Sequence, residues 1–224
     1  MQTPTFRPAL LALIAGLALS SSSSAQSTAA DVLKLVQANL DKAPWQATVI
    51  GKFSSSGGTQ EAEIGVQSVP GIDGALRMDF KKPAAMGGNF TVLTKKEAWN
   101  YLFVSNQVVM QPRASAKLND LEGQIAGLGD TNSFNTLLTL KLAGEVGTPD
   151  GAAWKLSGVP KKAGQTFASA EVLILKSDPR PLSVSFRDAG GKVVGTLDIQ
   201  SFKRATLSAK DLLSYPSDAA VVKK

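Results

Sequence analysis

The feature that most constrains the fold is a change of hydrophobic period at Pro44. After this residue, apolar side chains occupy every second position in residues 45–53, 62–66 and 76–80. Side chains alternate between the two faces of a strand, so each segment predicts a strand with one buried face. Turn-forming residues follow each segment, including the Ser54–Gly58 stretch and Pro70-Gly71. Successive strands joined by short turns predict an antiparallel meander.

Helical spacing occurs before Pro44 and again in the middle of the chain. Apolar residues from Val32 to Leu40 recur every three or four positions, and Asp31 is the expected N-cap. Weaker helical patterns cover residues 118–128 and 134–142, which predicts a helical insertion near residues 115–144. Strand patterns return in residues 154–159, 170–176, 182–187 and 193–202. We therefore expect a single domain over residues 26–216, mainly β with helices, followed by a flexible tail at residues 217–224.

Residues 1–25 are typical of a secretory signal peptide. Arg7 precedes an apolar run from Ala9 to Leu19, and Ser23 and Ala25 place small residues at the −3 and −1 positions of a cleavage site. The apolar run is shorter than the ~20 residues that a spanning helix needs. We expect cleavage near Ala25 and an exported, periplasmic protein that starts near Gln26.

The composition removes several classes of function. The chain contains no cysteine and no histidine, which excludes disulfides, thiolate nucleophiles, histidine-based triads and His-ligated metals. The formal net charge is +6, which fits either a solvated basic surface or contact with anionic lipid headgroups or envelope polymers. Glu61 and Glu63 share a strand face, but such a pair is more typical of a solvated surface than of an acid/base site. We therefore predict no enzyme activity, no catalytic residues, no metal, no cofactor and no nucleic-acid partner.

One stretch of sequence resembles a known family. It contains Leu76–Pro83, then Glu97–Leu102 with its Trp-x-Tyr pair, then Asn106-Gln107-Val108. This order resembles the LolA/LolB-like family of envelope lipoprotein carriers, which includes lipoprotein-sorting proteins. The resemblance implies an unclosed, strongly curved antiparallel β-barrel covered by an N-terminal helix and a helical lid. In the best-known LolA proteins an arginine in the basic-Pro step holds the lid shut, and the matching residue here is Lys82.

The resemblance also implies that acyl chains bind in an apolar space between sheet and helices. The apolar side of residues 76–80 is the natural inward side, although ordinary core packing would produce the same pattern. The expected lining residues are Leu76, Met78, Phe80, Ile64, Val66, Phe90 and Val92. The expected lid residues are Phe134, Leu137 and Leu138.

The function implied by this reasoning is that of a periplasmic carrier, a monomeric chaperone that shuttles lipoproteins or another lipid between membranes. By resemblance alone, its partners would be an inner-membrane ABC transporter and an outer-membrane acceptor. Two alternatives stay open. One is a regulatory or structural envelope protein of the same fold that senses lipid or a partner, and the other is a carboxylate enzyme acting on envelope polymers.

Overall fold

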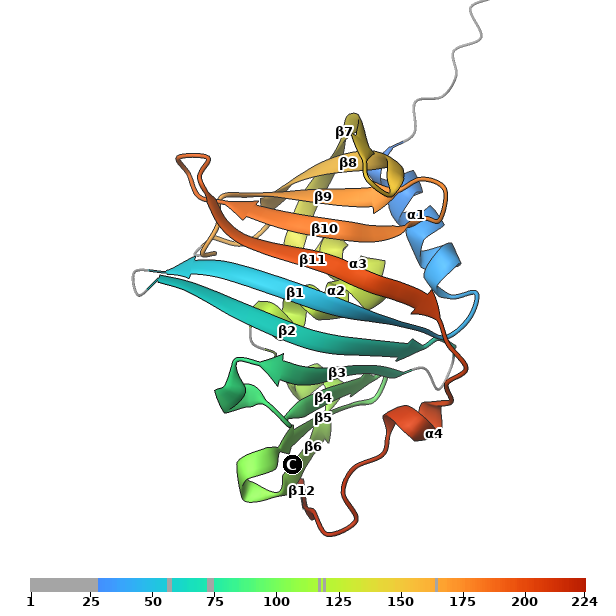
Figure 1. Cartoon of the computed structure of the whole chain (residues 1–224), viewed down its shortest axis with the longest axis vertical. Coiled ribbons are helices and arrows are strands. Elements are labelled where there is room, and N and C mark those ends of the chain that lie inside the picture. The colour runs from blue at the N-terminus through green and yellow to red at the C-terminus, as the bar shows by residue number, and fades with distance from the viewer. Residues whose placement is uncertain (1–27, 56–57, 72–74, 117, 119, 164) are drawn as a thin grey trace, which may run out of the picture.

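The structure is a computed structural model, and it describes residues 28–224 except 56–57, 72–74, 117, 119 and 164. The expected signal peptide therefore lies outside the described residues. The described strands form one sheet of twelve, in the order β12-β6-β5-β4-β3-β2-β1-β11-β10-β9-β8-β7. β1 and β11 lie side by side at its centre, so an early strand of the chain pairs with a late one (Figure 1).

Most elements are where the alternation predicts them. The strands are β1 (Trp45–Ser55), β2 (Gly58–Val69), β3 (Ala75–Lys82), β4 (Phe90–Thr94), β5 (Glu97–Leu102), β6 (Gln107–Pro112), β7 (Leu138–Thr148), β8 (Gly151–Pro160), β9 (Ser169–Leu175), β10 (Arg180–Arg187), β11 (Val193–Arg204) and β12 (Ala220–Lys223). The α-helices are α1 (Ala29–Leu40), α2 (Asp120–Gly129), α3 (Thr131–Leu137) and α4 (Ala209–Leu212), and the 3₁₀ turns are η1 (Ala84–Met86), η2 (Phe103–Ser105) and η3 (Arg113–Ser115).

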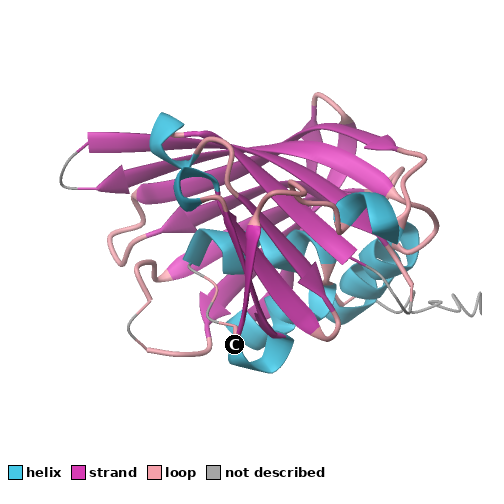
Figure 2. Cartoon of the chain, turned by 90° about the horizontal axis from the view of Figure 1, so that it is seen from below, coloured by secondary structure: helices cyan, strands magenta, loops and turns pink. Residues whose placement is uncertain are grey.

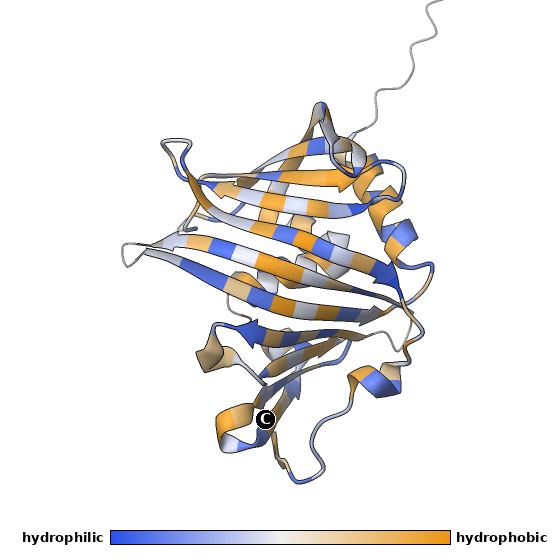
Figure 3. Ribbon diagram, viewed as in Figure 1, coloured by the Kyte–Doolittle hydropathy of each residue, from blue (hydrophilic) through white to orange (hydrophobic). Residues whose placement is uncertain are grey.

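The sheet curves strongly and does not close, and α1, α2 and α3 cover its concave face (Figures 1 and 2). This is the open, helix-covered architecture that the family resemblance implied. Residues of alternating hydropathy run along its strands (Figure 3). On most strands the apolar residues face the helices, and directly opposed residues of neighbouring strands share that face.

The N-cap of α1 lies three residues earlier than expected. Thr28 is the cap: its hydroxyl accepts from the backbone N–H of Asp31, and the Asp31 carboxylate accepts from the backbone N–H of Thr28 at 3.0 Å. Asp31 is thus the third helical residue of a capping box. The prediction placed Asp31 correctly at the helix start but gave it the wrong role there.

The expected helix through residues 134–142 is wrong in its second half. α3 ends at Leu137, and Leu138 begins β7, which pairs with β8. Leu138, Leu140 and Leu142 alternate with Thr139 and Lys141, so the same leucines satisfy a period of two. The leucines fit both helical spacing and strand alternation, and pairing with β8 selects the strand.

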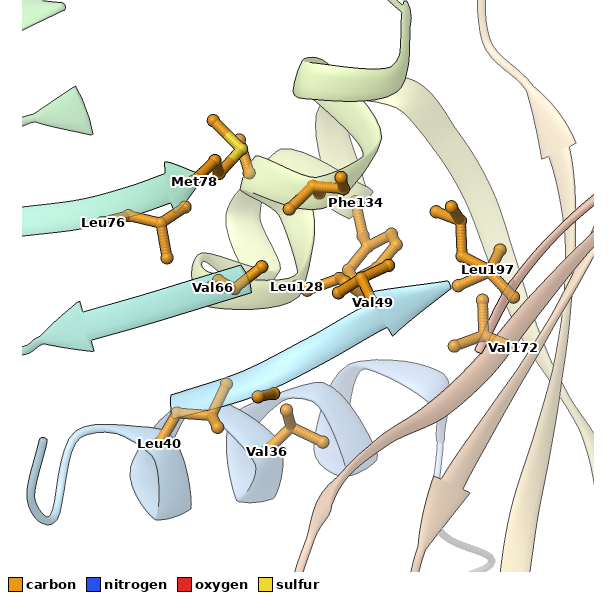
Figure 4. Close-up of a cluster of buried hydrophobic side chains, with 14 of the residues drawn as sticks. Val36, Leu40, Val49, Val66, Leu76, Met78, Leu128, Phe134, Val172 and Leu197 are labelled. Atoms are coloured by element: carbon orange, nitrogen blue, oxygen red, sulfur yellow. The ribbon is translucent and has the colours of Figure 1, made fainter. Parts of the chain in front are cut away.

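The main core fills the space between the concave face and the helices. Figure 4 shows side chains from α1, α2, α3 and several strands meeting there. Val36, Val49 and Met78 are at most 1% exposed. Burial of this kind contributes roughly 1.5–3 kcal/mol for each large apolar side chain.

A smaller cluster lies on the outer face and holds the C-terminal segment. Leu212 of α4 packs there with no exposed surface. The Arg77 guanidinium lies 3.8 Å from the centre of the Phe90 ring and donates to the carbonyls of Leu212 and Ser214. We expected residues 217–224 to be a flexible tail, but β12 within them pairs in parallel with β6.

Candidate functional site

A cavity of about 190 Å³ lies between the concave face and the two middle helices. The sheet side is formed by strands of the second half of the chain, with Val184 and Phe186 on β10 and Leu197 on β11. These three side chains are at most 5% exposed to solvent. The opposite side is formed by α2, α3 and the start of β7. The site therefore lies between a hydrogen-bonded sheet and two short helices, and one side of it is open.

The lining is apolar except at its edges. Phe134, Leu137 and Leu138 share the cavity with Phe186, whose ring lies 4.9 Å from the ring of Phe167, centre to centre. The apolar wall is completed by Leu118 and by Gly123, where an added Cβ would meet nothing within 4 Å. Such a lining suits an apolar ligand, because it removes apolar surface from water without leaving polar groups unpaired.

Three polar residues border the cavity. Lys162 and Gln165 lie in the exposed segment between β8 and β9, which marks the open side. The Gln124 Oε1 atom on α2 is buried without a hydrogen-bond partner in the described part of the chain. A ligand lying inside would thus have its polar end near Lys162, where water and a cationic side chain are available.

The three expected lid residues do lie at this cavity, but not all on one helix. Phe134 and Leu137 belong to α3, whereas Leu138 lies on β7. Phe134 is 5% exposed and Leu137 is 40% exposed, so α3 turns one side to the cavity and leaves another in solvent. The cover of this cavity therefore includes α2, α3, the start of β7 and residues of the segment between β8 and β9.

The expected lining residues lie elsewhere in the molecule. Ile64, Met78 and Phe80 belong to the packed core and are at most 4% exposed. Val66 borders a crevice of only about 10 Å³ beside Leu40 and Leu128, which is too small to hold a water molecule securely. None of the four borders the 190 Å³ cavity.

Leu76 borders a different hollow, a surface depression of about 780 Å³ near the ends of β2, β3 and β4. Its walls mix apolar residues with charged ones, including Asp41, Lys95 and Arg113. A mixed, charged surface of this kind is less suited to an acyl chain than the enclosed apolar cavity.

Phe90 and Val92 lie on the wrong face of the sheet to serve as lining. In the pairing of β3 with β4, Val92 is opposite Arg77, whereas Met78 is opposite Thr91. Phe90 and Val92 therefore pack into the outer cluster with α4. Residues 90–93 are apolar on both faces, so the sequence did not indicate which face turns toward the helices and which turns outward.

Hydrogen bonds attach α2 and α3 to neighbouring elements. The backbone N–H and the hydroxyl of Thr131 both donate to Gln37 Oε1, each at 3.0 Å, which joins α3 to α1. The hydroxyl of Thr91 on β4 donates to Glu122 Oε1 of α2 at 2.7 Å. The Lys161 ammonium donates to a backbone carbonyl of α3. Each hydrogen bond of this kind contributes about 0.5–1.5 kcal/mol, and more where a charged group takes part.

Lys82, which matches the family's lid arginine, makes its ion pairs within the sheet. Its ammonium is 3.2 Å from Glu63 and 4.0 Å from Glu61, both on β2. The hydrogen bonds of Thr131 and Glu122 therefore fix the helices in place. The family resemblance pointed to Lys82 for this role and did not indicate either residue.

The site residues that the sequence missed are Val184, Phe186, Leu197 and Phe167. The first three lie on strands that were predicted correctly, but no feature of the alternation separates a cavity wall from a packed core.

Among the residues that the structure describes, no cluster of three or more acidic side chains could hold a metal ion. Within the same residues, none of the helices has both the length and the apolar character needed to cross a membrane.

Comparison with solved structures identifies a relative. A crystal structure of an uncharacterized conserved protein from Thermus thermophilus is 38% identical, with a TM-score of 0.67, over 88% of this chain and 99% of that chain. The present chain belongs to the same family as that protein. No family model matches the sequence, and no curated protein matches it either.

A more distant structure shares the fold. MucB, in the Pseudomonas aeruginosa MucA/MucB complex, is 14% identical with a TM-score of 0.55, over 86% of this chain and 62% of that chain. The LolA superfamily protein NE2245 from Nitrosomonas europaea is 14% identical with a TM-score of 0.45, over 84% of this chain and 99% of that chain. The predicted architecture, an unclosed curved sheet covered by helices, is confirmed by the sheet described above.

Proposed function

We propose that the protein is a periplasmic carrier that binds acyl chains of lipoproteins, or of another envelope lipid, and moves them between membranes. The observation that carries the proposal is the mainly apolar cavity beneath α2 and α3. Transfer from water stabilises a bound chain by about 0.8 kcal/mol per methylene, so a chain of ~16 carbons gains roughly 12 kcal/mol before ordering costs. The carrier acts by binding alone and needs no cofactor.

Loading requires the helices to move. The cavity of about 190 Å³ is smaller than the roughly 300–1,000 Å³ typical of small-molecule pockets. The sheet wall is continuous and hydrogen-bonded, so we expect the space to grow by an outward movement of α2 and α3. A mobile lid also lets the ligand leave, which a carrier needs as much as affinity.

The proposed location rests on residues 1–25. Cleavage near Ala25 would deliver the rest of the chain to the periplasm without a lipid anchor, since the sequence has no cysteine to carry one. An inner-membrane ABC transporter as donor and an outer-membrane acceptor are partners proposed from the family resemblance. Intact-mass measurement of the exported protein tests this part, and retained residues 1–25 would contradict it.

The decisive experiment is mass spectrometry of organic extracts from protein purified out of the periplasm. We expect stoichiometric fatty-acyl material that a fluorescent fatty acid displaces in solution. Absence of any extractable lipid, together with failure to bind the fluorescent probe, would reject the carrier function.

A regulatory envelope protein of the same fold is the second candidate. It is favoured by the likeness to MucB, which was crystallised in complex with MucA. In that case the cavity would sense a lipid rather than transport it. Tight, slowly exchanging lipid with no transfer to acceptor vesicles would favour this alternative over a carrier.

A further inference from the structure

The turn between β5 and β6 presents three consecutive apolar side chains to solvent. Leu102 is 43% exposed, Phe103 is 59% exposed and Val104 is 95% exposed. The last two residues lie in η2, at the end of the hairpin and on the half of the sheet away from β10 and β11. Large apolar side chains gain nothing from such positions in a protein that meets only water, so a contiguous exposed set indicates a contact surface.

The turn is held in one shape. The backbone N–H of Phe103 donates to Asn89 Oδ1 at 2.8 Å, and the Tyr101 hydroxyl donates to Asn106 Oδ1 at 3.0 Å. Gly88 has φ +85°, and a Cβ there would lie 2.9 Å from Cγ of Phe103. Glycine thus permits both the backbone conformation and the close approach of the ring. The apolar side chains are presented by a fixed turn rather than by a loose loop.

A second turn lies against the first and is also apolar. η1 places Ala84 and Ala85 in solvent and Met86 partly so, and Gly88 joins it to Phe103. No charged residue occurs in residues 83–94 or in residues 98–112. Residues 84–86 and 102–104 together form a surface that we call the apolar tip.

We propose that the apolar tip docks the protein onto the interface of a lipid bilayer. The few side chains of the tip cannot supply the roughly 800 Å² per partner that a stable protein–protein interface buries. A bilayer surface is deformable and accepts single protruding side chains, provided that no charge accompanies them. Residues 84–86 and 102–104 themselves carry no charge, and the Asp218 carboxylate accepts from Asn106 Nδ2 at 3.1 Å behind them.

The charges behind the tip fit the same occupant. Lys81 and Lys82 shortly precede η1 and are more than half exposed, at 53% and 54% of their side chains. They share Glu63, at 3.6 and 3.2 Å, so the electrostatic attraction to anionic headgroups is modest. We infer that apolar insertion dominates and that anionic lipid adds a smaller increment.

The test is vesicle flotation of the purified protein with Val104→Asp as the test variant. Val159 on β8 is 53% exposed and lies outside the tip, so Val159→Asp is the matched control. Vesicles consist of phosphatidylcholine, alone or mixed with phosphatidylglycerol. We expect wild type and Val159→Asp to float with both, and Val104→Asp to partition about tenfold less, because one valine leaves the apolar phase and a charge enters it. Phe103→Ser should show a similar loss.

Thermal unfolding of all variants, measured in parallel, confirms that each is folded. The proposal is overturned if wild type floats with neither vesicle type, or if Val104→Asp and Phe103→Ser float as wild type does. It is also overturned if Val104→Asp and Val159→Asp lose partition equally. Self-association of wild type without vesicles that Val104→Asp abolishes would assign the tip to a second copy of the chain instead. Fatty-acid displacement, measured without vesicles, reports on the cavity independently.

Discussion

The two halves of the concave face have the same alternation but different interiors. Where Leu40 of α1 and Leu128 of α2 pack against β1 and β2, the crevice that remains is about 10 Å³, and its far side is formed by Pro181, Ile199 and Phe202. Over β10 and β11, α3 leaves a cavity of about 190 Å³. The difference lies in the covering helices rather than in the strands. Gly123 of α2 borders the cavity and has no side chain to fill it, whereas Leu40 of α1 and Leu128 of α2 border the small crevice.

This comparison teaches that a concave sheet face is not by itself a binding site. Phe80 is 4% exposed and Phe186 is 5% exposed, so burial of the side chain does not separate the two halves. Of these two rings, only Phe186 borders the cavity. The following predictions use that difference, beginning with the largest expected effect.

Replacing each of these phenylalanines by glutamate should separate packed core from cavity wall. Phe80→Glu should lower the free energy of unfolding by about 4 kcal/mol or more, because the carboxylate is buried in a solid cluster without a partner. Phe186→Glu should cost only about 2 kcal/mol, because the cavity can admit water. It should nevertheless abolish binding of a fluorescent fatty acid. Urea unfolding and probe titration measure the two effects.

Equal destabilisation by the two substitutions, with equal loss of probe binding, would contradict the division of the concave face into two halves. Binding retained in Phe186→Glu would place the ligand elsewhere, with the 780 Å³ depression beside Leu76 as the next site to test.

Filling the cavity should remove binding without removing stability. Gly123→Leu places a side chain where a Cβ meets no atom within 4 Å, and glycine within a helix is about 1 kcal/mol less favourable than alanine. We expect probe affinity to fall about tenfold while the urea midpoint stays the same or rises. Gly123→Ala is the control, since it removes the glycine but adds little volume. Loss of affinity in Gly123→Ala as large as in Gly123→Leu would point to helix flexibility rather than volume as the determinant.

The covering helices should also differ in mobility from the sheet that they cover. Backbone amides of α3 should exchange faster than those of β5, because α3 is short and a lid must open to load. Thr131→Val removes one hydrogen bond to Gln37, worth about 1 kcal/mol, so exchange in α3 should rise about fivefold with β5 unchanged. Hydrogen exchange followed by mass spectrometry measures both segments. Equal protection of α3 and β5 in wild type would argue against a lid.

The predictable part of this structure is the part that local pattern determines. Strands β1 to β3 follow from alternation, and α1 follows from the spacing of Val32, Val36 and Leu40. β7 was missed because its leucines satisfy two periods, and only the partner strand β8 selects one of them. The expected lining residues lie on other strands than the cavity of about 190 Å³, because alternation marks which face of a strand is apolar and not what covers that face.

The outer face was even less predictable. Phe90 and Val92 belong to a segment that is apolar on both sides, so pairing register alone assigns them to the outer cluster. The position of α4 depends on Arg77 donating to the carbonyls of Leu212 and Ser214, which lie 135 and 137 residues further along the chain. No spacing in the sequence indicates such a contact.

The smallest expected effect concerns the acid dependence of α1, which helps to fill the packed half and does not border the cavity. Hydrogen bonds from the Thr28 side chain and then its backbone N–H lower the pKa of Asp31. A lowered pKa means that the unfolded chain binds the proton more readily. The stability from this capping box is therefore present above the unfolded pKa of about 3.9, and it is lost as the pH falls through the lower folded pKa.

Asp31→Asn should accordingly reduce stability at neutral pH and make little difference at pH values well below the folded pKa of Asp31, as urea midpoints at both pH values would show. Because α1 belongs to the packed half, fatty-acid affinity at neutral pH should not change in this variant. The Asp31 carboxylate lies at the start of α1, which does not border the cavity. If Asp31→Asn lowered fatty-acid affinity in parallel with the free energy of unfolding, the two halves of the concave face would be energetically coupled.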